Sequence, residues 1–357
     1  MMTSRERVRV VFEGGIPDRV PIHDGYWDDA LQRWTCEGLP PEIAADKDDS
    51  LGEFFGTEIR LVRINDSFLV KEKVLEEDDR YITQLNKNGG VEKFIKGRTS
   101  TPGLISFAVN SRAEWEEMKG RLRSVEGRLP SDLESHYRNF RKNDRFVMAC
   151  VHEPYEASWS KLGPEFLLES MITDPDLVRD VFETMTDLEI AVCEDLFGRG
   201  YEVDGAWIWG DIAYSRGLLF SPGIYRDILY PCHKRLIGYF AGKGLPVVYH
   251  SDGDIRPVIP LLIEAGARCI QPLEAKAGMD LLELKREYGD RLVFMGNVDF
   301  EQVTKGREAA EQEIRTKVGL GKEGGGYIYH SDHSVPPTMS LEDYRHVLDL
   351  VRKYGKY

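Results

Sequence analysis

The residues of this chain best suited to bind a metal lie in the segment His250-Ser251-Asp252. Side chains on an extended segment repeat every two residues, so His250 and Asp252 point to the same side and could hold one ion. His333, or else His330 three residues before it, could supply a third ligand. Three protein ligands with an open fourth position are typical of catalytic zinc. The spacing suits equally well a hydrogen-bonded His-Asp pair that fixes an imidazole tautomer without a metal.

Such residues need elements that bring them together, and the chain offers eight short β-branched or aromatic runs. Segments of helical period alternate with these runs, which is the pattern of βα units around a parallel sheet. The runs lie at residues 20–23, 58–64, 146–151, 204–209, 246–250, 267–271, 291–295 and 326–330. Eight strands close a (β/α)8 barrel, so the pattern predicts an α/β fold of the TIM-barrel class.

Capping signals mark the intervening helices. Asp174 followed by Pro175 predicts a helix start, and the apolar residues after it recur every three or four positions. Residues 70–100 break the alternation and predict two charged strands joined by the turn at 88–90, a surface hairpin inserted in the barrel. Because no linker or repeat divides the chain, we expect residues 1–357 to form a single domain.

The active site of such a barrel lies at the carboxyl ends of its strands. Five of the eight histidines follow the predicted strands, whereas His136, His233 and His346 lie in predicted helices. The polar or aromatic residues after the strands are His23 and Asp24, Asn65 and Asp66, His152, Glu153 and Tyr155, Trp209 and Asp211, His250 and Asp252, Gln271 and Glu274, Asn297 and Asp299, and His330, Asp332 and His333. The enrichment in histidine favours a functional ring.

Composition excludes several classes of protein. The net charge of −14 has the wrong sign for a surface that binds nucleic acid or anionic lipid. The five cysteines contain no CxxC pair, and free thiols fit a reducing compartment. Neither a signal peptide nor a long uncharged apolar run is evident. We therefore expect a cytoplasmic enzyme that acts on a small molecule.

The ordered series of motifs resembles the uroporphyrinogen decarboxylase superfamily, and it lies closer to the cobalamin-dependent zinc methyltransferases than to the decarboxylase of haem synthesis. The resemblance implies a (β/α)8 fold with its site at the strand carboxyl ends. It covers almost the whole chain and rests on SRERVRVVFEGGIPDRVPI, FGTEIRLV, EPYEASWSKLG, the block from DGAWIWGD to PCHKRL, PVVYHSDGDIRPVIPLLIEAGARCIQPLE, LVFMGNVD and GGGYIYHSDHSVPPTMSLEDY.

The chain departs from the decarboxylase pattern in two places. Decarboxylase members carry arginines just after the first strand to receive the carboxylates of the porphyrinogen, whereas this chain reads PIHDGYWDDALQRWTCEG with Arg33 as the only nearby arginine. Carboxylates that face carboxylates without cations are strongly disfavoured. The family's catalytic aspartate matches, at best, Glu58, while the last-turn histidine matches His333.

Methyltransferase members bind zinc through His-x-Cys after the fifth strand and a cysteine in the last turn. Here Asp252 and His333 replace the two cysteines, and both residue types are competent zinc ligands. The resemblance thus implies zinc, or a similar divalent metal, at His250, Asp252 and His333. It also implies a corrinoid, carried by a partner protein, as the methyl donor, with a small-molecule methyl donor as the alternative. By analogy with relatives the chain would form a homodimer.

Further roles complete this hypothesis. Asp211 and Glu153 would orient the substrate or move a proton, and substrate contacts would come from His23, His152, Tyr155, Trp209, Gln271, Asn297 and His330. The alternative is a metal-free decarboxylase, in which Glu58 or Asp211 stabilises a protonated substrate and His333 lies near the leaving carboxylate. A third alternative is a sensor that binds a ligand without turnover.

Overall fold

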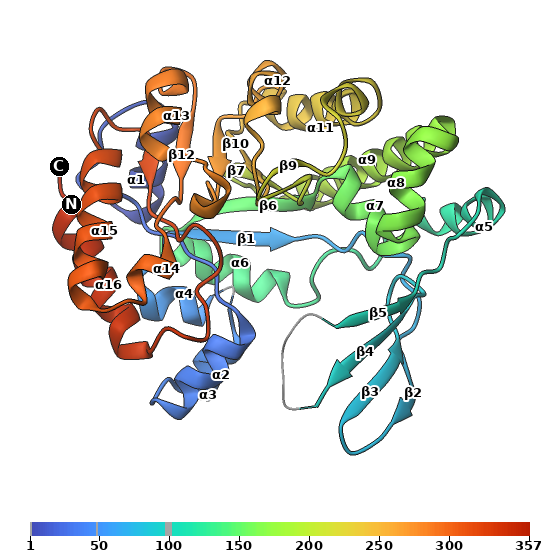
Figure 1. Ribbon diagram of the computed structural model, residues 1–357, viewed down its shortest axis with the longest axis horizontal. Helices are drawn as coiled ribbons and strands as arrows, with labels where there is room; N and C mark the ends of the chain where they lie inside the picture. The colour runs from blue at the N-terminus through green and yellow to red at the C-terminus, as the bar shows by residue number, and fades with distance from the viewer. Residues whose placement is uncertain (1, 48, 97–101) are drawn as a thin grey trace.

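A curled parallel sheet of seven strands forms the centre of the computed structural model, which describes residues 2–47, 49–96 and 102–357 (Figure 1). Each strand falls in or at one of the runs predicted from the sequence. In spatial order the strands are β1 (Ile59–Arg63), β6 (Phe146–His152), β7 (Gly205–Trp209), β10 (Val247–His250), β11 (Cys269–Gln271), β12 (Val293–Met295) and β13 (Tyr327–Ile328).

The first predicted run, residues 20–23, lies between β13 and β1 but forms one isolated bridge, from Ile22 to Tyr329, instead of a strand. The Tyr329 N–H donates to the Pro21 carbonyl at 2.9 Å, and the His23 N–H donates to the Tyr329 carbonyl at 3.1 Å. On the other side, the Glu58 N–H donates to the Ile22 carbonyl at 2.8 Å. These contacts curl the sheet, and a fully closed eight-stranded barrel stays a prediction.

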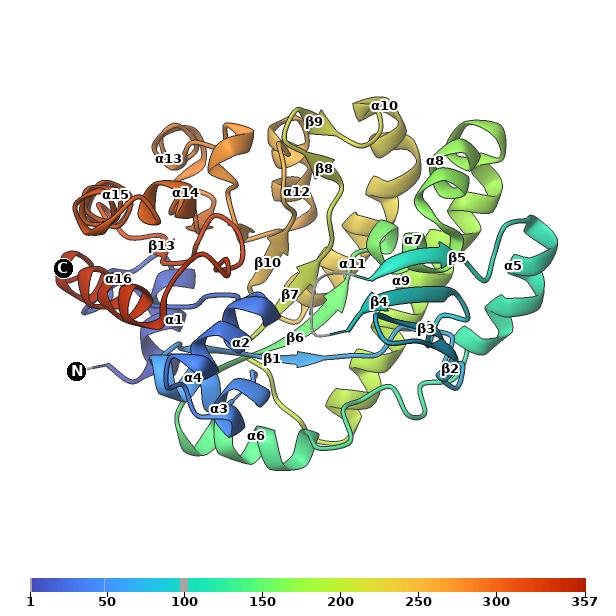
Figure 2. The ribbon, with the colours of Figure 1, turned by 60° about the horizontal axis from the view of Figure 1, so that its bottom comes forward.

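Helices cover the outer face of the sheet (Figures 1 and 2). The predicted helix start at Asp174 is confirmed, because its side chain accepts from the Leu177 N–H at 3.3 Å; α16 begins in the same way, with Ser340 accepting from the Asp343 N–H at 3.1 Å. The main helices are α1 (Ser4–Phe12), α2 (Asp28–Cys36), α3 (Pro41–Ala45), α4 (Ser50–Phe55), α5 (Arg112–Met118), α6 (Leu133–Lys142), α7 (Pro154–Leu162), α8 (Pro164–Thr173), α9 (Pro175–Gly198), α10 (Pro222–Ile224), α11 (Tyr230–Gly242), α12 (Ile259–Ala265), α13 (Leu281–Tyr288), α14 (Phe300–Val303), α15 (Arg307–Gly321) and α16 (Leu341–Tyr354). None in the described part of the chain has the length and apolar character needed to cross a membrane.

Two apolar cores follow from the alternation of side chains along the strands. The larger one lies between the sheet and the helices. The smaller one fills the inside of the curled sheet, where α1 contributes Val8, Val11 and Phe12. Its strand residues are Ile59, Phe146, Met148, Cys150, Trp207, Val248, Cys269, Val293, Met295 and Ile328. This inner core fixes which face of each strand points inward.

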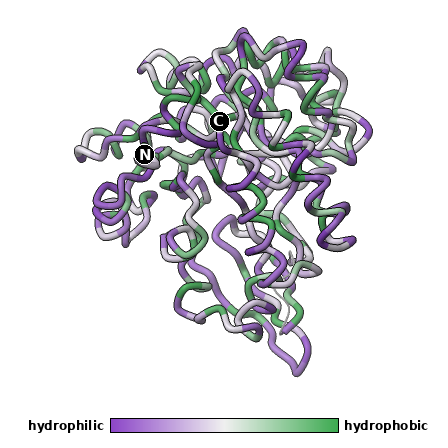
Figure 3. Tube along the Cα trace, turned by 90° about the vertical axis from the view of Figure 1, so that its left-hand side faces the viewer, coloured by the Kyte–Doolittle hydropathy of each residue, from purple (hydrophilic) through white to green (hydrophobic). Residues whose placement is uncertain are grey.

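The inserted segment is larger than the predicted two-stranded hairpin. Four antiparallel strands form it: β2 (Lys73–Glu77), β3 (Tyr81–Leu85), β4 (Val91–Ile95) and β5 (Gly103–Ser106). β3 and β4 are the predicted pair joined by the turn at 88–90, whereas β2 and β5 were missed because their side chains are largely exposed and show no clear alternation. Residues 97–100 of the predicted hairpin lie outside the described residues. The sheet projects from the body, and hydrophilic chain forms its tip (Figure 3).

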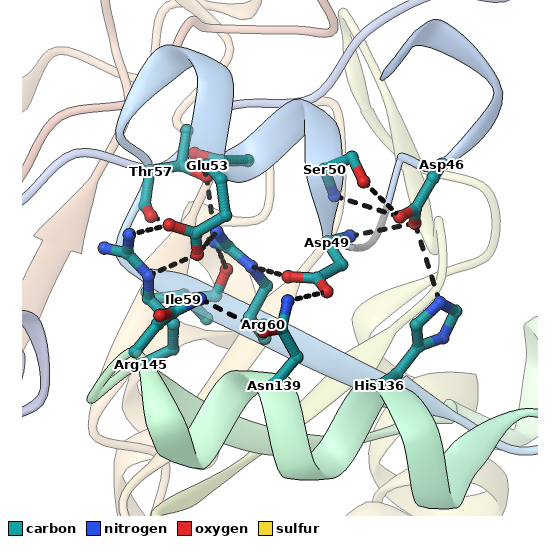
Figure 4. Close-up of polar contacts among 12 residues, drawn as sticks. Asp46, Asp49, Ser50, Glu53, Thr57, Ile59, Arg60, His136, Asn139 and Arg145 are labelled. Atoms are coloured by element: carbon teal, nitrogen blue, oxygen red, sulfur yellow. Dashed lines mark hydrogen bonds and ion pairs between the residues drawn. The ribbon is translucent and has the colours of Figure 1, made fainter. Parts of the chain in front are cut away.

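Outward-facing Arg60 anchors β1 to the surrounding helices (Figure 4). Its guanidinium is 2% exposed, donates to Glu53 at 2.8 Å and to the Thr57 carbonyl at 2.9 Å, and lies 3.9 Å from Asp49. Asn139 on α6 donates to the same Asp49. Because a buried guanidinium needs several acceptors, this network fixes β1 against α4 and α6.

Candidate active site

Side chains alternate between the two faces along each strand. The alternation that points the inner-core residues inward therefore also determines which side chains point inward at the carboxyl ends of the strands. Above Cys150 and Trp207 on β6 and β7, the next inward positions are His152 and Trp209; the same step on β1, β10, β11 and β13 gives Arg63, His250, Gln271 and His330. His23 joins them, because its ring lies 5.8 Å from that of His330 and 5.4 Å from Trp207. These residues form the layer that we call the mouth.

A directional chain of hydrogen bonds sets the tautomer of His250. The carbonyl of Ser331 can only accept, so the His330 Nδ1 2.7 Å away carries a proton and His330 Nε2 is left as an acceptor. The Gln271 amide nitrogen donates to that Nε2 at 3.2 Å, which directs the Gln271 carbonyl oxygen to His250 Nδ1. His250 therefore carries its proton on Nδ1, and the Nε2 lone pair is available.

Two carboxylates face this lone pair. His250 Nε2 lies 3.6 Å from Asp211 Oδ1, which also accepts from the Asp252 N–H at 2.8 Å. One ligand atom each from Asp211, His250 and Asp252 all lie within 4.8 Å of one another. Burial raises the pKa of Asp211, and the neighbouring Asp252 charge adds to this shift. One imidazole nitrogen and two carboxylates form a donor set that suits zinc or a similar divalent cation.

The structure brings His333 to the same cluster, but on the far side of Asp252. His333 Nε2 lies 3.1 Å from Asp252 Oδ2, and His333 Nδ1 accepts from the Ser334 N–H at 2.8 Å. An imidazole that accepts at Nδ1 carries its proton on Nε2, so His333 donates to Asp252. In this arrangement Asp211, and not the expected His333, joins His250 and Asp252, while His333 orients the Asp252 carboxylate.

Two groups of the mouth are held uncharged by burial. Burial lowers the pKa of His330, and it lowers the pKa of His23 well below its ordinary value, with the neighbouring His330 adding to the effect. The His23 Nδ1 is buried without a hydrogen-bond partner among the described residues. Asp24, expected in the same ring, accepts from Tyr344 at 3.0 Å and from Tyr329 at 3.2 Å and so ties α16 to the strand ends.

A second cluster lies on the β1 and β6 side of the mouth. His152 Nδ1 and Lys161 Nζ each lie 3.3 Å from Asp66 Oδ2. Behind them is Glu189 on α9, whose two carboxyl oxygens are buried and have no hydrogen-bond partner in the part of the chain that the structure describes. Burial raises the pKa of Glu189 well above its usual range, and the charge of Asp66 acts in the same direction. Sequence reasoning found Asp66 and His152 but missed Lys161 and Glu189, which come from helices.

Glu156 in the first turn of α7 is a further residue that the sequence did not reveal. Its Oε2 accepts from the Asp211 N–H at 3.4 Å, and burial raises its pKa to about 7. Gly210 permits this approach, since a Cβ there would lie 2.3 Å from Glu153 Cγ and 2.5 Å from Glu156 Cβ. Glu156 lies one helical turn beyond the end of β6, and this position is the sequence signal that could have identified it.

Glu153 and Tyr155, expected at the site, are part of the outer packing. Glu153 is fully buried, caps α7 and binds His233 Nε2 at 2.8 Å, and His233 Nδ1 contacts the Tyr225 hydroxyl at 3.1 Å. Tyr155 is 3% exposed and packs edge-on against Phe220 at 5.5 Å. The chain turns into α7 after His152, so these two side chains point to the helix layer.

Asn297 also has a structural role in place of the expected substrate contact. It is fully buried with φ of 68°, donates to the Leu273 and Met279 carbonyls, and accepts from the Leu281 N–H at 3.1 Å and from Lys317 at 2.6 Å. These bonds use the whole amide, so Asn297 holds the loops after β11 and β12.

Glu58 lies at the amino end of β1, opposite the mouth, which corrects the expectation of a catalytic acid. It ion-pairs with Arg7 and, at 3.0 Å, with Arg19, and it accepts from the Ile22 N–H at 2.8 Å. The carboxylate is fully buried. These contacts close the bottom of the curled sheet.

We expect Glu58→Gln to destabilise the fold by about 2–4 kcal/mol, because it removes the buried charge that compensates Arg19 and, together with Asp18, Arg7. Urea unfolding measures this loss. The exposed pair of Glu134 and Arg138 offers a control, and Glu134→Gln should leave the midpoint unchanged. If the Glu58→Gln protein has normal stability and binds metal normally but is inactive, Glu58 has a chemical role.

Comparison with known proteins identifies the family. The model of the uroporphyrinogen decarboxylase (URO-D) family matches residues 155–354, more than half of the chain. The chain belongs to the uroporphyrinogen decarboxylase family. Two curated relatives are named uroporphyrinogen decarboxylase: one from Streptomyces coelicolor is 24% identical over 184 residues, and one from Pelobacter propionicus is 21% identical over 187 residues.

The matches to these family members cover about half of each protein: 51% of this chain and 48% of the Streptomyces protein, and 52% of both for the Pelobacter protein. A solved structure, described as a methyltransferase from Methanosarcina mazei, has the same fold over 99% of both chains, with a TM-score of 0.68 and 15% identity. The URO-D family match and this likeness agree with the fold expected from the motif series.

Proposed function

We propose that this member of the URO-D family is a metal-dependent methyltransferase built on a closed (β/α)8 barrel. It would move a methyl group from a methylated corrinoid, carried by a partner protein, to a small acceptor. The observation that carries the proposal is the tautomer of His250, whose Nε2 lone pair faces Asp211 and Asp252. These three residues would hold zinc or a similar ion. Such an ion lowers the pKa of an acceptor group bound beside it and makes that group a better nucleophile.

The protein's own groups prepare the acceptor. His333 orients Asp252 through its Nε2–H, and Gln271 with His330 keeps the proton of His250 on Nδ1. Trp209 stacks on the His250 ring at 5.5 Å and 19°, so it forms an apolar wall beside the cluster. The motif series and the fold shared with the Methanosarcina methyltransferase support this function.

Metal content tests the proposal. We expect about one zinc or related ion per chain in protein purified without chelators, and we expect a strong chelator to abolish demethylation of methylcobalamin in the presence of a thiol acceptor. Absence of a stoichiometric metal would remove this function.

The second candidate, decarboxylation, is favoured by the names of the two curated relatives. Release of carbon dioxide from uroporphyrinogen by metal-free protein would establish it instead.

A further inference from the structure

Three buried side chains, Glu153, His233 and Tyr225, form a hydrogen-bonded group in the helix layer behind Asp211, which we call the support network. Glu153 Oε2 lies 2.8 Å from His233 Nε2, and His233 Nδ1 lies 3.1 Å from the Tyr225 hydroxyl. All three residues are at most 1% exposed, so they act only through the groups that they contact. Burial of polar groups costs free energy unless they are hydrogen-bonded, and here they satisfy one another.

A π-helical turn brings Tyr225 to His233. Tyr225 begins the π-helix Tyr225–Leu229, which leads into α11, the helix that carries His233. Residues eight apart lie about 80° apart around the axis of a regular α-helix. The wider π-turn takes up about one extra residue, so these two side chains come onto the same face. Such turns are rare and frequent at functional sites, and this one completes the support network.

The other end of the support network reaches the loop that carries Asp211. The Glu153 N–H donates to the Trp209 carbonyl at 2.8 Å, and Glu153 Oε1 accepts from the Glu156 N–H. Glu156 Oε2 in turn accepts from the Asp211 N–H at 3.4 Å. Gly210 packs directly against both glutamates, because a Cβ there would lie within 2.5 Å of each. A movement of the Glu153 side chain is therefore transmitted to the peptide before Asp211.

His233 fixes the orientation of the Glu153 side chain. A carboxylate can only accept, so His233 carries a proton on Nε2 and donates to one oxygen, while the Glu156 N–H donates to the other. Without His233, one buried oxygen of Glu153 would lose its donor. The side chain would then have to turn away from the first turn of α7 to find another.

We propose that the support network positions Asp211 beside His250. Asp211 Oδ1 lies 3.6 Å from His250 Nε2 and accepts from the Asp252 N–H at 2.8 Å, so a displaced Asp211 loop would lengthen both contacts. The members of the support network are positioning residues that do not reach the mouth themselves. Their effect on metal affinity rests on the proposed function, whereas their effect on the position of Asp211 does not.

His233→Phe tests the support network, because an aromatic ring keeps the packing against Tyr249 at 5.4 Å but makes neither hydrogen bond. Deuterium exchange of the Asp252 N–H, followed by NMR in chelator-treated protein, reports the contact with Asp211. We expect this exchange to become at least about 10-fold faster, while the Val293 N–H on β12 exchanges as in the wild type. We also expect zinc affinity, measured by competition with a chelator, to fall about 10-fold.

Three further variants serve as controls. His233→Gln keeps an N–H that can donate to Glu153 and should stay within about 3-fold of the wild type in both measurements. Tyr225→Phe removes only the outer hydrogen bond and should change both in the same direction, by about 3-fold. Tyr249→Phe should behave as the wild type, because the hydroxyl that it removes has no hydrogen-bond partner among the described residues.

Unchanged exchange of the Asp252 N–H in His233→Phe would overturn the proposal, and Tyr225→Phe decides the question in the same way if His233→Phe fails to fold. Equal acceleration at Val293 would also overturn it, because a merely structural role loosens the whole fold. A wild-type chain that binds no zinc but shows the expected exchange keeps the support network and loses the methyltransferase proposal. A zinc-binding chain whose variants exchange like the wild type loses only the support network. Faster exchange with unchanged zinc affinity would keep the positioning and remove Asp211 from the ligands.

Discussion

Replacing His250 with alanine is expected to reduce bound zinc from about one ion per chain to almost none and to lower kcat/KM for methyl transfer at least about 100-fold. His250 supplies the nitrogen of a cluster whose other members are Asp211 and Asp252. Without it, two neighbouring carboxylates must hold the ion alone. Elemental analysis together with the methylcobalamin assay measures both effects.

Gln271→Leu tests the role of the His250 tautomer, because His250 itself stays in place as a ligand. It keeps His250 but removes the acceptor of its Nδ1–H, so we expect zinc affinity to fall about 10–100-fold. His136→Ala, at a histidine on the outer helix α6, is the matched control and should retain full metal content. Stoichiometric zinc in purified His250→Ala would contradict the assignment of this ligand.

The second large effect is expected for Asp66→Asn. The substitution removes the carboxylate shared by His152 and fully buried Lys161, and we expect a loss of about 2–4 kcal/mol in the free energy of unfolding at neutral pH. Glu189→Gln is the matched control: burial raises the pKa of Glu189 well above its usual range, so a neutral carboxyl is exchanged for a neutral amide. In the Asp66→Asn protein Glu189 can ionise beside Lys161, so the double variant should lose more than the sum of the single losses.

The pH dependence of this cluster has a definite sign. The pKa of His152 is raised to about 9 from 6.5, so its contribution to stability is complete below 6.5 and is lost as the pH rises through 9. The Asp66 pKa is lowered from 3.8, despite burial, by Lys161 and His152, and that contribution disappears as the pH falls below 3.8. The difference between wild type and Asp66→Asn in urea unfolding should therefore be largest near pH 5–6 and smaller at pH 10, where the contribution of His152 is lost and only the pair of Asp66 with Lys161 remains. An unchanged NMR titration of His152 in Asp66→Asn would contradict this account.

Local sequence signals were sufficient for most of the architecture. The seven strands lie at the predicted runs, and the helix that starts after Asp174 is capped as expected. These features depend on residues close in sequence: alternation of apolar side chains and single hydrogen bonds at helix ends. The inserted sheet was underestimated because exposed strands such as β2 lack an apolar face.

Position after a strand also predicted much of the mouth. His23, His152, Trp209, His250, Gln271 and His330 all lie there. The same rule failed for Glu153, Tyr155 and Asn297, because the chain turns away from the axis within one or two residues of the strand end. It also overlooked Arg63, because the predicted run extended to residue 64 and placed Arg63 inside the strand, whereas β1 ends at Arg63.

The sequence by itself predicted the seven strands of the parallel sheet, the capped helix after Asp174, the family and the histidines at the strand ends. Only the tertiary structure decided that Glu58 lies at the bottom of the sheet, that Asp211 joins His250 and Asp252, and that Lys161 and Glu189 from the helix layer reach His152. The physical reason is that the two-residue period of a strand determines which way each side chain points within that one segment. Which groups meet depends on the register between strands and on the packing of helices far away in the chain.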